Sequence, residues 1–114
     1  MNPLEPRPID LPATVDLGLR ADLASHPARC TLAVWHHPRF SSGTTYGSNV
    51  NLTSLYAALY DLGVDVLLTA HESNYERFAP LNAAGQPDDV RGVREFVVGT
   101  GGRSHAVFSD SGLT

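Results

Sequence analysis

The sequence contains no lysine, only one cysteine and no long apolar run. All 8 basic residues are arginines, which excludes chemistry that needs a lysine amine, such as a Schiff base or the lysine of a P-loop. The single cysteine, Cys30, excludes an internal disulfide framework and a cysteine-rich zinc site, and we expect it to be a small buried residue that opens a strand. No segment approaches the ~18–20 consecutive apolar residues of a membrane span. The first residues also lack the basic start and the apolar stretch of a signal peptide, so we expect no membrane partner.

The composition is ordinary for a globular protein. With 114 residues, of which 42% are apolar, the chain can form one domain with a hydrophobic core. The formal net charge of −4 argues against a dedicated nucleic-acid-binding protein, so we expect no nucleic-acid partner. Four prolines within residues 1–12 predict an extended arm without a helix. The folded unit is expected to span residues 13–114.

Two helices are predicted. Residues 13–25 place leucines on one face and end before a His-Pro pair. Residues 51–62 repeat apolar side chains at positions i, i+3, i+4 and i+7, the spacing of an amphipathic helix. We expect Asn51 to cap the start of this second helix and Gly63 to end it in the left-handed conformation.

Short apolar runs between breaker residues predict the strands. Residues 30–35 and 64–69 are almost continuously apolar, which is typical of parallel strands buried on both faces. Further strands are predicted over residues 75–81 and 94–100, and another around residues 106–108. The fold class is therefore predicted to be α/β.

The order strand, helix, strand over residues 30–69 predicts a βαβ unit with two parallel strands. Parallel strands end at the same edge of their sheet, and open α/β sheets bind ligands at that edge. His36 follows the first strand and His71 follows the second. We therefore expect these two imidazoles to meet at one rim, although they are far apart in the sequence.

Three of the five histidines, His36, His37 and His71, lie at these strand ends. Neutral imidazole is the commonest metal ligand among the side chains, and ligands from different segments make a defined site. Pro38 stiffens the segment that carries the first two. The alternative is that strand-end histidines simply face solvent, and spacing alone leaves both interpretations open.

Residues 70–78, AHESNYERF, are the most specific stretch of the chain. They resemble the Gly-His-Asp-His-Asn-Tyr-Glu-Arg motif of calcineurin-like metallophosphoesterases, in the purple-acid-phosphatase-like or alkaline-phosphatase-D-like branch. The His-x-Pro segment at residues 36–38, the loop at residues 39–43 and the glycine-rich run at residues 97–102 are similar to that family in the same order. The resemblance covers roughly residues 15–105 and implies the carboxyl-terminal half of the family's four-layer αββα sandwich.

The resemblance implies a metal-dependent phosphoric ester hydrolase, in which two metal ions hold the phosphoryl group and generate the nucleophile. His36 and His71 match two histidines that bind the same metal in the family. The implied cofactors are divalent or trivalent transition metals, Fe, Zn or Mn, and the implied substrate is a phosphate ester. If the protein is like its family, it is secreted or periplasmic.

Three positions depart from the family pattern. Ser73 stands where the second metal would have its histidine, so this ligand position is lost, and a hydroxyl is a poor substitute for imidazole. Glu72 is the nearest carboxylate that could replace it. Tyr46 stands where related sequences carry a substrate-binding histidine, which makes a catalytic role for it doubtful. Ala70 replaces a glycine, which costs about 1 kcal/mol if the position requires a positive φ.

The family's remaining ligands come from Asp-x-His, Gly-Asp and Gly-Asn-His-Asp motifs in an amino-terminal half, and none of these occurs in this sequence. We therefore expect at most one metal site here, completed by an amino-terminal half or a partner chain. A half-sandwich also leaves an apolar face or edge of the sheet uncovered, which favours self-association. The alternative function is a degenerate, non-catalytic binding or scaffold domain that keeps half of the fold.

Overall fold

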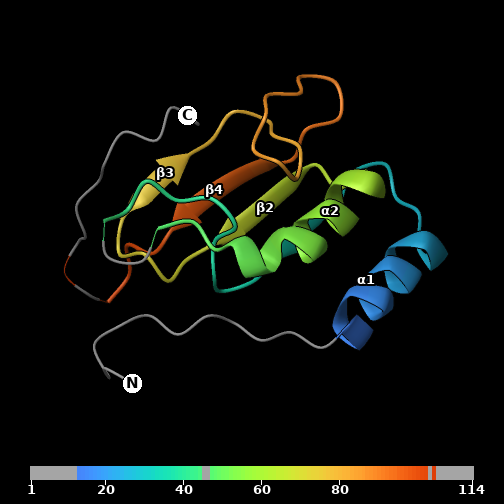
Figure 1. The fold of residues 1–114 in the computed structure, drawn as a ribbon, viewed down its shortest axis with the longest axis horizontal. Helices are drawn as coiled ribbons and strands as arrows, with labels where there is room; N and C mark the ends of the chain where they lie inside the picture. Colours follow the sequence, from blue (N-terminus) through green and yellow to red (C-terminus); the bar gives the residue numbers. More distant parts are fainter. Residues whose placement is uncertain (1–12, 45–46, 103, 105–114) are drawn as a thin grey trace.

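The computed structural model describes residues 13–44, 47–102 and 104 (Figure 1). The elements follow the chain in this order: α1 (Ala13–Ser25), β1 (Leu32–Val34), the 3-10 helix η1 (Val50–Leu52), α2 (Thr53–Asp61), β2 (Val66–Thr69), β3 (Tyr75–Arg77) and β4 (Arg94–Val98). The fold is α/β, as predicted. The expected arm at residues 1–12, the strand around residues 106–108 and Tyr46 lie outside the described residues.

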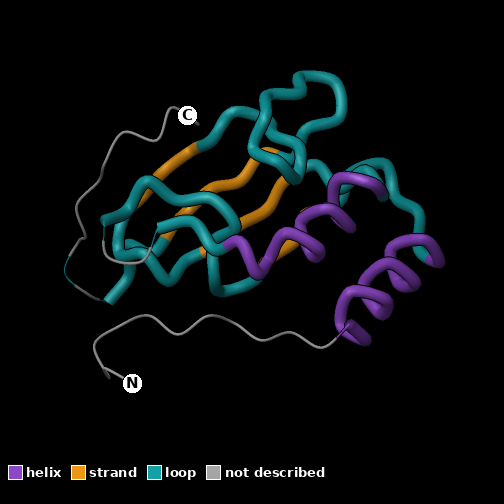
Figure 2. Tube along the Cα trace, viewed as in Figure 1, coloured by secondary structure: helices purple, strands orange, loops and turns teal. Residues whose placement is uncertain are grey.

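The four strands form one sheet in the order β1-β2-β4-β3. β1 and β2 are parallel, with Val34 opposite Leu68, and β2 and β4 are parallel as well. β3 runs antiparallel to β4 at the other edge. The helices α1 and α2 contact each other, and Figure 2 shows them together at one side of the sheet. The predicted parallel pair of a βαβ unit is thus present.

The two faces of the sheet differ sharply in exposure. The face toward α2 is buried, and its side chains include Leu67, Thr69, Glu95 and Val97. The alternate residues of the same strands face the other way, and at the β1 edge Leu32 is 57% and Val34 69% exposed. The prediction that the first strand is buried on both faces is wrong, because no described element covers this second face. The uncovered apolar face expected of a half-sandwich is confirmed.

The core lies between the sheet, α2 and the chain that follows β3. It consists of Phe40, Tyr56, Leu59, Val64, Leu67, Phe78, Leu81, Val93 and Val97. The Phe40 ring meets the Tyr56 ring edge-on with centroids 5.2 Å apart. Because Phe40 comes only three residues after His37, this contact fixes the loop that leaves the predicted histidine rim.

Several local predictions need correction. Cys30 is exposed, because β1 begins two residues later than expected. The cap precedes the helix by a turn of 3-10 helix: the Asn49 side chain accepts the N–H of Asn51, so Asn51 is not the cap. Gly63 has φ 78°, and its predicted left-handed conformation is confirmed. The third strand ends at Arg77, earlier than expected.

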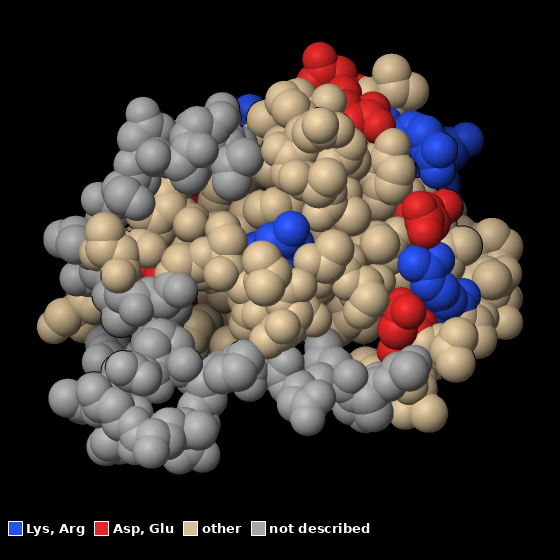
Figure 3. Space-filling model, viewed as in Figure 1, with Lys and Arg blue, Asp and Glu red and all other residues tan. Residues whose placement is uncertain are grey.

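The charged side chains of the face shown in Figure 3 lie mostly along one margin, on the side of the helices. Arg20 of α1 contacts Asp16 at 3.3 Å and Asp61 of α2 at 3.0 Å. These exposed pairs link the two helices, although each is worth little by itself. Within the described residues, the helices are too short or too polar to cross a membrane.

Candidate metal centre

The parallel ladder between β1 and β2 continues beyond the strands and brings His36 beside His71. The Trp35 N–H donates to the Leu68 carbonyl at 3.1 Å, and the Ala70 N–H donates to the His36 carbonyl at 2.8 Å. His36 therefore stands opposite Ala70, directly before His71. Nε2 of His36 and Nδ1 of His71 lie 3.2 Å apart, and their tautomers decide which nitrogen donates. The two imidazoles meet at the carboxyl-terminal edge of the sheet, where the topology predicts them.

His37 adds a third imidazole to this rim. Its ring centroid lies 4.2 Å from that of His71 and 4.8 Å from that of His36. One ring nitrogen from each of the three residues lies within 4.8 Å of the other two. Sequence reasoning left metal binding open for all three histidines, and the family resemblance assigned ligand roles to His36 and His71 only, because the path of the chain through the His-His-Pro turn cannot be inferred from spacing. We refer to His36, His37 and His71 as the histidine cluster.

Burial and the neighbouring imidazoles favour the neutral forms of His37 and His71. Desolvation, followed by the neighbouring imidazoles of His37 and His36, lowers the pKa of His71 to about 4. Desolvation and then the nearby His36 also lower the pKa of His37. Imidazole binds metal ions in its neutral form, so two of the three rings are ready to bind at neutral pH without losing a proton.

The backbone at His71 adopts an unusual conformation. His71 has φ 62°, and the Glu72 N–H donates across it to the Ala70 carbonyl at 2.7 Å, which closes a γ-turn. A positive φ in a non-glycine residue costs free energy, and such residues gather at functional sites. The positive φ falls on His71 and not on Ala70, so the alanine that replaces the family's glycine carries no such cost.

The side chain of Glu72 lies away from the histidine cluster. Glu72 is fully buried, and its carboxylate accepts the Gly47 N–H at 2.7 Å. The same carboxylate lies so close to Gly43 that a Cβ there would come within 2.6 Å of it. Among the described residues, the group of possible metal ligands contains three histidines and no carboxylate. Glu72 thus helps to hold the segment after His37 in place, at Gly43 and at Gly47.

Two more buried carboxylates hold the same loop after His37. Glu95 of β4 accepts the N–H groups of Arg39 and Phe40, each at 3.0 Å. Glu76 of β3 accepts the Ser42 N–H at 2.8 Å and also the Ser42 hydroxyl. Glu95 was missed, although a charged residue at an inward position of an apolar strand is a signal for a buried hydrogen-bonded group.

Ser73, at the expected lost ligand position, lies in the bend between His71 and β3 and is partly exposed. Its hydroxyl is a weak ligand beside the three imidazoles.

The histidine cluster suits a single transition-metal ion. Nitrogens bound at about 2.1 Å to one ion stand ~3.0–3.4 Å apart for angles between 90° and tetrahedral. The 3.2 Å between His36 and His71 falls in this range. The ligand atoms of the whole group lie within 4.8 Å of one another, so that all three would bind one ion only after a small shift of the side chains. Imidazole ligands suit Zn and Fe, and three histidines leave a coordination position open for water or substrate.

Comparisons with known proteins identify the fold. No protein-family model matches the chain, and no curated protein matches its sequence. Among solved structures, the chain is similar to a purple acid phosphatase isolated from yellow lupin (Lupinus luteus) seeds, with a TM-score of 0.70 and 21% identity. The similarity covers 82% of this chain and 19% of that chain. The chain therefore has the fold of a segment of a purple acid phosphatase and spans about a fifth of that protein's length.

Proposed function

We propose that this chain supplies part of the metal site of a phosphoric ester hydrolase of the acid-phosphatase type. The histidine cluster carries the proposal, because three imidazoles meet at the sheet edge where α/β proteins bind ligands. In this proposal His36 and His71 bind one transition-metal ion, Fe, Zn or Mn, and His37 is a third ligand. Such an ion polarises a phosphoryl oxygen and provides a nucleophile at neutral pH.

The site needs further groups to hold two metal ions. No carboxylate joins the cluster within the described residues, so a second cation would lack a bridging anion there. Ser73 gives the second ion no imidazole. The chain also spans 19% of the similar phosphatase. We propose that an amino-terminal half or a partner chain supplies the missing ligands, and that the chain alone holds at most one ion.

Metal uptake tests the ligand assignment. Chelator-treated chain is dialysed against Zn²⁺, Mn²⁺ or Fe²⁺ separately, and bound metal is measured by elemental analysis and calorimetry. We expect uptake of a single ion that the His36→Ala and His71→Ala variants lose. His26→Ala is the matched control, because His26 is exposed and its ring contacts Asp22 near the end of α1, outside the histidine cluster. Uptake that is equal in all four proteins would overturn the assignment.

Hydrolysis tests the reaction. We expect a longer protein, in which this chain is joined to the proposed amino-terminal half, to hydrolyse an aryl phosphate. The His71→Ala variant of that longer protein should be inactive. The absence of a carboxylate from the cluster also favours a second function, a non-catalytic binding or scaffold domain. Failure of the chain to bind metal, together with an inactive longer protein, would favour that alternative.

A further inference from the structure

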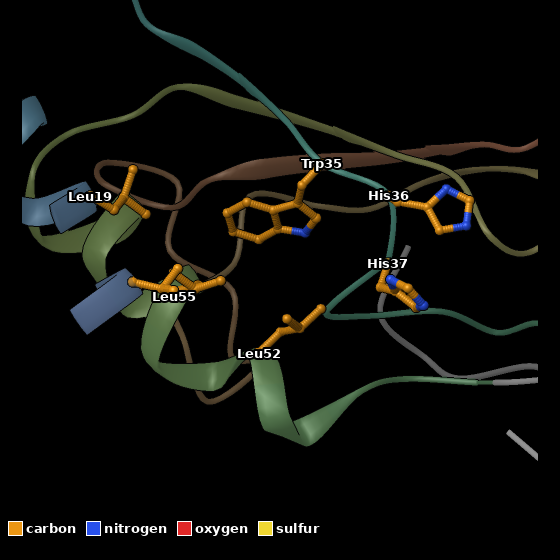
Figure 4. A pocket seen from close by; sticks show the side chains of 7 residues that line it. Leu19, Trp35, His36, His37, Leu52 and Leu55 are labelled. Carbon is orange, nitrogen blue, oxygen red and sulfur yellow. The ribbon is translucent and has the colours of Figure 1, made fainter. Parts of the chain in front are cut away.

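An apolar pocket lies directly beside the histidine cluster, between α1, α2 and the end of β1. Its volume is about 400 Å³, within the range of small-molecule sites. Figure 4 shows the side chains around it. The lining residues are Val15, Leu19, Trp35, His36, His37, Leu52 and Leu55.

Two members of the histidine cluster form one wall of this pocket. His36 and His37 line it, and the other lining side chains carry no formal charge. A ligand whose anionic end lies at the imidazoles can therefore extend its organic part toward leucines of α1 and α2. The geometry suits a molecule that is charged at one end and apolar at the other.

Trp35 gives the pocket a polar group as well as an aromatic surface. Its indole N–H is buried and has no hydrogen-bond partner, although a buried unpaired donor is costly. In Figure 4 the indole nitrogen lies on the side of the ring toward His37. An acceptor oxygen on a ligand at the rim could satisfy this donor, while the indole face offers an aromatic ring a stacking surface.

We propose that this pocket binds the aromatic group of an aryl phosphate ester, with the phosphate at the histidine cluster. The inference rests on the proposed function, since the phosphate is held at the proposed metal site. It adds the substrate class, because it predicts that phosphate esters of an aromatic alcohol bind in preference to esters of a polar alcohol. The two imidazoles at one end of an otherwise largely apolar lining and the unpaired Trp35 N–H support this orientation.

Trp35 also reports on occupancy, because it is the only tryptophan of the chain. The Zn²⁺-treated chain is titrated with phenylphosphonate, which resists hydrolysis, and with inorganic phosphate, while Trp35 emission is recorded. We expect phenylphosphonate to bind about 10- to 100-fold more tightly than phosphate, the factor expected for burial of an aromatic ring, and to shift the emission. Equal affinity for the two ligands would overturn the inference.

Matched variants locate the bound ring. Leu19→Phe fills the pocket from α1 and is expected to weaken phenylphosphonate binding about tenfold or more, with little change for phosphate. Leu17→Phe is the control, since Leu17 is on the same helix, 64% exposed and outside the pocket lining. Val15→Asn, at a pocket residue that is 41% exposed, tests the same prediction with less risk to folding. Unchanged phenylphosphonate affinity in both pocket variants would overturn the inference.

A titration with phenol separates this inference from the proposed function. If the chain binds no metal, the proposed function fails, but a neutral aromatic ring can still enter the pocket. A saturable change of Trp35 emission with phenol that Leu19→Phe abolishes would support the aromatic site alone. Absence of any response to phenol and to phenylphosphonate would overturn it.

Discussion

At His71 the chain places a candidate ligand in a conformation that the side chain does not favour. The γ-turn around it closes with φ 62°, and this turn directs the residue to the rim where His36 lies 3.2 Å away. Glycine would adopt this backbone without cost, whereas any side chain is strained there. The imidazole is thus present despite a backbone cost, a feature that is common among residues of functional sites.

Substitution at this position separates backbone strain from ligand loss. His71→Gly is expected to be more stable than His71→Ala by about 1 kcal/mol, because both remove the imidazole but only glycine relieves the strain. Urea unfolding measures the difference, and both variants should lose metal uptake. Leu17 is exposed in the middle of α1, and there the order of stability should be reversed. Leu17→Ala should be more stable than Leu17→Gly by about 1 kcal/mol. Equal stability of the two His71 variants would contradict the strain.

Glu95 is a second residue whose position controls its chemistry. Desolvation raises its pKa to about 8 despite the N–H groups of Phe40 and Arg39 and the Thr69 hydroxyl, which favour the charged form. Thr69 has one hydroxyl hydrogen and two acceptors, each at 3.2 Å: Glu95 and the Phe96 carbonyl. A protonated Glu95 can donate to Thr69, which then donates to Phe96, so every group is satisfied.

This protonation makes stability depend on pH. Between the ordinary value of 4.5 and about 8, the folded chain holds a proton on Glu95 that the unfolded chain has lost. The free energy of unfolding therefore falls as pH rises through this interval, by on the order of a few kcal/mol. The lowered pKa of His71 acts in the opposite direction, but only below its ordinary value of 6.5. The decline should therefore be clearest from pH 6.5 to 8.

Glu95→Gln tests this pH dependence. The variant cannot ionise, so its free energy of unfolding should change less between pH 6.5 and 8 than that of the parent chain. The amide also loses an acceptor for a backbone N–H, which costs about 1–3 kcal/mol at every pH. Urea unfolding at a series of pH values separates the constant loss from the slope. Parallel curves for the two proteins would contradict a protonated Glu95.

At the scale of elements, the end of β4 packs against the turn that carries His71. Gly99 donates its N–H to the Asn74 carbonyl at 3.0 Å, and a Cβ on Gly99 would lie 1.8 Å from the Glu72 carbonyl oxygen. The two backbone segments therefore cross at a distance that only glycine allows. This crossing joins the predicted glycine-rich run to the histidine rim and gives the run a structural role.

Gly99→Ala is expected to destabilise the chain by about 3 kcal/mol or more, because neither backbone segment can move freely. Gly101→Ala is the control, since a Cβ there meets no atom within 4 Å. Thermal and urea unfolding compare the two variants, and metal uptake shows whether the His71 turn has moved. A Gly99→Ala chain within about 0.5 kcal/mol of the parent would contradict the close crossing.

The elements that the sequence predicts are those that depend on local patterns. Breakers and apolar runs locate both helices and the parallel strands, and parallel topology then brings His36 to His71. The cap was misplaced because Asn49 and Asn51 both satisfy the capping rule, and a turn of 3-10 helix selects the earlier one. The position of His37 and the inward orientation of Glu95 depend on how residues 38–44 pack against the sheet, which local patterns do not specify.

At the scale of the whole molecule, one face of the sheet is covered and the other face is open to solvent. The helices and the loop after β3 bury the first face around a continuous core. The second face presents apolar residues of β1 to solvent, and among the described strands β1 is also an edge strand of the sheet. Monomeric proteins rarely expose large contiguous apolar patches. This face therefore favours contact with another sheet, either a second copy of the chain or the half-domain proposed above.

Self-association of the isolated chain tests that expectation. Sedimentation velocity should show dimers or larger species whose fraction rises with concentration, because burying Leu32 and Val34 removes apolar surface from water. Val34→Ser should shift the equilibrium toward monomer by about 1 kcal/mol or more, corresponding to roughly fivefold weaker association. Val90→Ser is the matched control, since Val90 is 93% exposed in the loop before β4 and outside the sheet. A parent chain that stays monomeric at high concentration would show that the open face does not associate by itself. If Val34→Ser changes the association equilibrium no more than Val90→Ser does, the contact lies elsewhere on the molecule.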